Sequence, residues 1–158
     1  MDELHLSYLD LLKELSGSLD RLSQLAQEKT AAVRADDLIA LDEVLKQEQA
    51  MALNLRGLEL RRLKLVAQLG LDGVPLSNLP ERYPAHLQDE AYRVVDTLRR
   101  SSTIYRSYAD QARNSLELGL HQIEKVITAA GVDPKLAAAG YESPNVEPPK
   151  NMKTDFRA

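Results

Sequence analysis

Three long runs of leucine and alanine at helical spacing dominate this chain. Residues spaced alternately four and three positions apart line one side of an α-helix, and such a stripe is stable only when it packs against other helices. In the first run these positions are Leu4, Tyr8, Leu11, Leu15, Leu22 and Leu25. Further leucines and alanines widen this stripe, which suits a helix with two neighbours. The first helix is therefore predicted over about residues 2–33.

A second apolar run follows in a different register. Its apolar positions, which lie three, four or seven residues apart, are Leu38, Leu41, Leu45, Ala52, Leu55, Leu58, Leu65 and Leu69. The register changes near Asp36 and Asp37, and either aspartate can cap a new helix. No Gly or Pro marks this change, so one long bent helix remains an alternative. Gly70 comes directly after the last leucine, where glycine commonly ends a helix, so the second helix is placed at about residues 37–69.

A linker with two glycines and three prolines occupies residues 70–84 and cannot be crossed by a helix. The third run, at about residues 85–130, would span roughly 65 Å as one helix. Its apolar stripe consists of Leu87, Ala91, Val94, Leu98, Ser102, Tyr105, Ala109, Ala112, Leu116, Leu120, Ile123 and Ile127. We therefore predict an all-α fold, an elongated bundle of three long, mostly antiparallel, coiled-coil-like helices.

The predicted bundle occupies residues 1–131 and is followed by a tail of different composition, residues 132–158. The tail contains four prolines and many polar residues, which is typical of a segment that is disordered when it has no partner. Leu136, Tyr141 and Phe156 are its isolated apolar residues. Either they belong to a short binding motif or the tail simply happens to contain them.

Composition and charge exclude several classes of protein. The formal net charge of −4 argues against a nucleic-acid partner, which requires a basic surface. The chain has no cysteine, so it has neither disulfides nor thiol chemistry. Its first residues, MDELHLSYLD, are acidic and do not resemble a signal peptide. No apolar run approaches the roughly 18 residues that a membrane span requires, so we expect a cytoplasmic protein without membrane insertion.

No pattern of catalytic or metal-binding residues is present, and we predict neither a catalytic site nor a cofactor nor a metal. His5, His86 and His121 lie far apart in the sequence. Glu117 lies four residues before His121, but such pairs are common on helix surfaces. Glu48 and Arg62 fall at or beside the apolar stripe of the second helix, where charged residues more often fix the register of helices than perform acid–base chemistry.

The C-terminal part of the third helix is the candidate partner-binding site. This helix is longer than its two companions, so they cannot cover its whole stripe, and uncovered apolar surface commonly marks a partner site. The predicted contact residues are Leu116, Leu120, Ile123, Val126 and Ile127, with Tyr141 in the tail as the next candidate. The alternative is that this stripe is buried in the chain's own bundle or in a homodimer.

The order and lengths of these segments resemble the flagellar export chaperones of the FlgN type over about residues 1–145. The resemblance rests on Glu28-Lys29, Asp36-Asp37, Leu45-x-x-Glu48, Leu58-Glu59-x-Arg61-Arg62, Leu69-Gly70, the linker, Asn114 and Gly140-Tyr141. It implies a cytoplasmic chaperone, not an enzyme. Such a protein binds hook–filament junction proteins, prevents their premature polymerisation and delivers them to the flagellar type III export apparatus. It also implies that the third helix and the following region contact the client.

Three other interpretations remain open at this point. The chain could be another secretion chaperone or adaptor of the same shape, which the identity of its client would reveal. It could be a structural coiled-coil protein, which would form a homo-oligomer without a heterologous client. It could be a helical enzyme with a metal in the bundle core, which would contain stoichiometric metal after purification.

Overall fold

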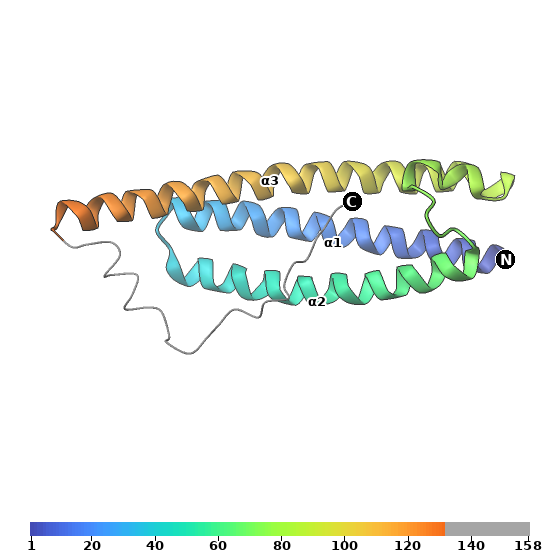
Figure 1. Cartoon of the computed structure of the whole chain (residues 1–158), viewed down its shortest axis with the longest axis horizontal. Helices are drawn as coiled ribbons and strands as arrows, with labels where there is room; N and C mark the ends of the chain where they lie inside the picture. Colours follow the sequence, from blue (N-terminus) through green and yellow to red (C-terminus); the bar gives the residue numbers. More distant parts are fainter. Residues whose placement is uncertain (132–158) are drawn as a thin grey trace. The chain divides into compact units, whose positions relative to one another are not determined.

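The computed structural model describes residues 1–131 and consists of three long helices (Figure 1). These are α1 (Asp2–Arg34), α2 (Leu38–Leu69) and α3 (Gln88–Ala129). Three short 3-10 turns, η1 (Leu76–Asn78), η2 (Pro80–Arg82) and η3 (Ala85–Leu87), lie between α2 and α3. No strand occurs in the described part of the chain, and the predicted all-α helical bundle is confirmed.

A sharp turn separates α1 from α2, so the two are separate helices and not one bent helix. Asp36 has a left-handed backbone with φ of 51°, which no helix can continue through. The side chain of Asp37 then accepts a hydrogen bond from the backbone N–H of Ala40 at 3.0 Å and caps α2. The turn reverses the chain, and α2 packs against α1 in the antiparallel direction (Figure 1).

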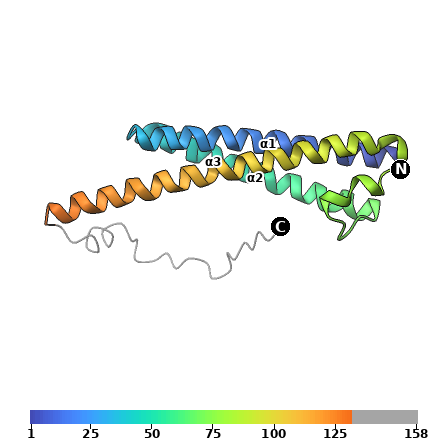
Figure 2. The same ribbon diagram turned by 90° about the horizontal axis from the view of Figure 1, so that it is seen from above.

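The linker after α2 folds back onto the start of α1. Gly70 ends α2 in the left-handed conformation, with φ of 66°. In both views the linker lies beside the N-terminal end of α1 (Figures 1 and 2). Its residues Leu79, Pro80 and Tyr83 are buried, whereas Leu76 is exposed. The Tyr83 hydroxyl donates a hydrogen bond to the backbone carbonyl oxygen of His5 at 3.0 Å.

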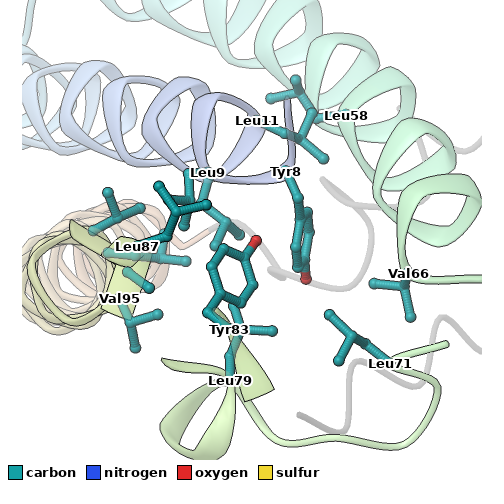
Figure 3. Packing of buried hydrophobic residues seen from close by; sticks show 14 residues of the cluster. Tyr8, Leu9, Leu11, Leu58, Val66, Leu71, Leu79, Tyr83, Leu87 and Val95 are labelled. Atoms are coloured by element: carbon teal, nitrogen blue, oxygen red, sulfur yellow. The ribbon is translucent and has the colours of Figure 1, made fainter. Parts of the chain in front are cut away.

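The main core lies where all three helices meet the linker (Figure 3). Its buried residues are Tyr8, Leu9, Leu11, Leu12, Leu58, Val66, Leu71, Leu79, Tyr83, Leu87, Ala91, Val94, Val95 and Leu98. A smaller cluster, Leu22, Leu25 and Val44, continues the contact between α1 and α2, and Tyr105 of α3 packs against it. The first half of α3 is thus anchored on both other helices and on the linker.

The predicted apolar stripe of α2 was wrong for several residues. Leu38 and Leu45 are 76% and 42% exposed, and Ala52 is also exposed. Val44 and Val66, which the predicted stripe omitted, are buried together with Leu58. The reason is that α2 carries leucines around most of its circumference, so the stripe with the most regular spacing is not the one that faces the core.

The described residues form two compact units. The first unit, Met1–Gly119, contains α1, α2, the linker and α3 up to Gly119. The second unit begins at Leu120 and includes the last turns of α3. The predicted tail, residues 132–158, lies outside the described residues.

Candidate partner-binding surface

Within the first unit, the apolar stripe of α3 is buried at its start and becomes accessible toward Gly119. Ala91 and Leu98 are 0% and 5% exposed, and Ala112 is still buried. Leu116 is only half-buried, although it continues the same stripe. A Cβ atom added at Gly119 would lie 3.5 Å from Cγ1 of Val33, so this glycine is close to α1. Leu116 is therefore the last residue of this stripe in the first unit, and it is partly accessible to solvent.

A cavity of about 270 Å³ lies between the three helices beside Leu116. Its walls combine small apolar side chains with a few charged ones, and they are formed by Leu22, Ala26, Lys29, Glu48, Tyr105, Ala109, Ala112, Arg113 and Leu116. The cavity exists because the alanines of α3 face the alanine and leucine of α1 without filling the space between the helices. It gives this end of the first unit an apolar hollow next to a pair of opposite charges.

An ion pair between Lys29 of α1 and Glu48 of α2 forms one wall of this cavity. Lys29 Nζ lies 2.8 Å from Oε1 of Glu48, and the two side chains are 17% and 26% exposed. Burial raises the pKa of the neighbouring Tyr105 hydroxyl, and the Glu48 carboxylate adds to that rise, so Tyr105 stays protonated. Glu48 is therefore a partner of Lys29 that fixes α1 against α2, as the register interpretation predicts.

The second charged residue of the predicted stripe, Arg62, is paired within its own helix. Its Nε and one terminal nitrogen donate to the two carboxylate oxygens of Glu59, both at 2.8 Å. This bidentate hydrogen bonding lowers the pKa of Glu59 and raises the pKa of Arg62. Both groups therefore remain charged, and neither is tuned to exchange protons near neutral pH.

In the second unit, the predicted contact residues are largely exposed. Leu120, Ile123 and Val126 are 60%, 56% and 69% exposed, and Ile127 is half-buried. Their spacing places Leu120, Ile123 and Ile127 on one side of α3, with Val126 beside them. Tyr141, the remaining candidate, lies outside the described residues.

One exposed apolar residue of α3 was missed by the stripe analysis. Leu118, in the first unit, is 64% exposed. It falls on the opposite side of the helix from Leu116 and Leu120, since residues two apart lie about 200° apart around an α-helix. Its position outside the heptad pattern gave no signal in the sequence.

Residues 1–131 contain no cluster of three or more His, Asp or Glu side chains that could hold a metal ion. None of their helices is long and apolar enough to cross a membrane. The α3 surface offers apolar area on an exposed helix, and such area is suited to packing against another polypeptide.

Comparison with models of protein families matches residues 5–137 to the family described as FlgN protein. The chain belongs to the FlgN family. This family consists of flagellar export chaperones, so the chain is a chaperone of flagellum biogenesis, as the sequence resemblance indicated. No curated protein and no solved structure gave a match.

Proposed function

We propose that this FlgN protein binds hook–filament junction proteins through the C-terminal part of α3, prevents their premature polymerisation and delivers them to the flagellar export apparatus. The observation that carries the proposal is the exposure of Leu120, Ile123 and Val126, each more than half accessible on a helix of an export-chaperone family. An apolar side chain of this size costs free energy when it stays in water, and its burial against a client recovers that free energy.

The chemistry of the client fits this surface. A subunit that polymerises through its own terminal helices must keep their apolar faces covered until it is exported. A helix with apolar side chains on one side covers such faces by packing against them, as in other helix-in-groove complexes. Within the first unit, the half-buried Leu116 and the adjacent cavity offer further apolar surface.

The remaining partners follow from the same role. Delivery requires a contact with the export apparatus in the cytoplasm, and Tyr141 in the tail is our second candidate for a partner contact. The net charge of −4 does not suit a nucleic-acid partner. The other partner considered from the sequence is a second copy of the chain. Pairing of two copies requires a contact surface separate from the one proposed for the client.

The test is a charge substitution in the exposed stripe. The double variant Leu120→Asp, Ile123→Asp places two carboxylates at the centre of the proposed contact, and isothermal titration calorimetry with a purified junction protein measures the effect. Loss of two central apolar anchors should weaken binding at least about thirtyfold. A matched control, Leu118→Asp with Thr128→Asp, adds the same charge at exposed positions on the other side of the helix and should bind normally.

Circular dichroism decides how a loss of binding is interpreted. Both double variants should keep the helicity and melting temperature of the parent, since the substituted side chains of the stripe are exposed. A folded Leu120→Asp, Ile123→Asp variant that binds the junction protein normally would contradict the proposed site and direct the search to Tyr141. If this variant unfolds while the control does not, the stripe belongs to the protein's own core.

A further inference from the structure

The cavity between the three helices of the first unit measures about 270 Å³. Protein interiors contain few voids larger than one water molecule, whose share of the liquid is about 30 Å³. The stripe of α3 carries large side chains at Leu98, Tyr105 and Leu116, but it carries alanines, Ala109 and Ala112, where it lines the cavity. A leucine at Ala109 would occupy this space and would suit the helix equally well. The alanines therefore leave open a space that ordinary core residues would close.

The charges in the cavity wall do not balance. Lys29 and Glu48 neutralise each other, since their charged atoms are 2.8 Å apart. Arg113, the other charged residue of the wall, is 71% exposed, and its guanidinium lies 4.0 Å from the carboxylate of Asp110, beyond hydrogen-bonding distance. That pair leaves the N–H groups of Arg113 available to a carboxylate of another molecule. The wall thus suits an occupant with an apolar body and a negative charge nearby.

The size of the cavity narrows the choice of occupant further. Pockets for drug-sized ligands measure about 300–1,000 Å³, so this cavity lies just below their range. An apolar cavity of about 150 Å³ already holds a benzene molecule, so a space of about 270 Å³ holds one large aliphatic or aromatic side chain. Helices commonly recognise one another by inserting such a side chain between the residues of a facing surface.

We propose that this cavity receives one large apolar side chain, a leucine, methionine or phenylalanine, from a helix of the junction protein. Arg113 then pairs with an acidic residue about one turn away on the same client helix, since residues three or four apart lie on one side of a helix. The inference rests on the proposed function, because it specifies which part of that client the first unit binds. A buried apolar anchor beside a charged contact is the usual composition of the residues that dominate an interface.

Filling the cavity tests the proposal. Ala109→Leu places a side chain where that of the client would lie, and calorimetric titration with a purified junction protein should show an affinity reduced at least about tenfold. Its melting temperature should equal or exceed that of the parent, because the added side chain gains contacts in an existing space. The matched control is Ala67→Leu, the same substitution at an exposed position of α2 away from the cavity, which should bind normally.

Charge reversal tests the acidic neighbour of the occupant. Arg113→Glu should lower the affinity at least about fivefold, and the loss should shrink as the salt concentration rises, because salt screens an exposed charge pair. Arg113→Lys keeps the positive charge and should retain most of the affinity. Arg106→Glu makes the same charge change at another exposed arginine of α3, which does not line the cavity, and should bind normally.

Thiol protection tests whether the client enters the cavity. The chain has no natural cysteine, so Ala109→Cys provides a single thiol in the cavity wall. This thiol should react with iodoacetamide in the free chain and should react at least about tenfold more slowly when the junction protein is bound. The exposed thiol of Ala67→Cys should react at the same rate in both states.

Three results would overturn the proposal. One is a folded Ala109→Leu variant with the affinity of the parent, and if that variant does not fold, normal binding by Arg113→Glu decides in its place. Another is a thiol in Ala109→Cys that reacts equally fast with and without the client. The third is a thiol already protected in the free chain, which would show that the cavity is closed without a client.

The failure of this inference differs from the failure of the proposed function. Normal binding by Ala109→Leu, together with loss of binding by Leu120→Asp with Ile123→Asp, would reject the cavity as a client site and leave the proposed function standing. A parent chain that binds no junction protein would reject both.

Discussion

Tyr83 holds the linker onto α1, and its replacement should destabilise the whole first unit. The side chain is 3% exposed and sits in the main core among Tyr8, Leu79 and Leu87 (Figure 3). Its ring meets the His5 ring edge-on, with centroids 4.6 Å apart. Since the linker also sets where α3 begins, Tyr83 connects the start of α1 with the start of α3.

Two substitutions separate the contributions of the hydroxyl and the ring. Tyr83→Phe removes only the 3.0 Å hydrogen bond to the His5 carbonyl oxygen, which should lower the free energy of unfolding by about 0.5–1.5 kcal/mol. Tyr83→Ala also removes the buried ring and leaves a cavity, and large-to-small changes of this kind cost about 3–5 kcal/mol. The ring should therefore account for most of the free energy of unfolding that is lost in Tyr83→Ala.

Urea denaturation followed by circular dichroism measures both values, and Tyr92 provides the control. Tyr92 is 49% exposed on the same part of the molecule, in α3, so Tyr92→Phe and Tyr92→Ala should each change the free energy of unfolding by about 0.5 kcal/mol or less. A cost below about 1 kcal/mol for Tyr83→Ala would refute the reasoning, because it would mean that the linker does not unfold together with the helices.

Three further predictions concern local features of the same unit. Asp37→Ala removes the cap of α2 and should cost about 1 kcal/mol, measured by urea denaturation, whereas Asp37→Ser should retain most of the stability. Gly70→Ala forces a side chain into the left-handed conformation at φ of 66° and should cost about 1 kcal/mol in the same assay, although no atom blocks its Cβ. Burial raises the pKa of Tyr83 above its ordinary value, so its contribution to stability is complete below pH of about 10 and is lost as the pH rises further. The stability difference between the parent and Tyr83→Phe should accordingly shrink in alkaline solution, and a difference that grows would contradict the buried, protonated hydroxyl.

The helices and their ends could be read from the sequence because their signals are local. Gly70 after the last leucine of α2 predicts a left-handed C-terminus, and the structure has it. Asp37 has the short polar side chain that a cap needs, and it caps α2. The three prolines of the linker exclude a helix, and only 3-10 turns form there. Each of these features depends on a few neighbouring residues and on no distant contact.

The side of α2 that faces the core could not be read in the same way. Leu38 and Leu45 have the regular spacing of a seam, yet the buried residues are Val44 and Val66. Periodicity shows that an apolar stripe exists, but it does not show which of the two leucine stripes of α2 packs against α1. That choice depends on packing between the helices. The contact of Tyr83 with His5 could not be predicted for a related reason. A tyrosine between two prolines gives no indication of which distant residue it will contact.

The candidate client site was predicted by a comparison of lengths and not by any motif. A third helix longer than its companions must leave part of its stripe uncovered, and Leu120, Ile123 and Val126 are indeed exposed. The same argument did not predict that Leu53, Leu60 and Leu63 of α2 are exposed. This helix is no longer than α1, and the side of it that faces the core is known only from the structure. Exposure in the structure is what distinguishes the two stripes of α2.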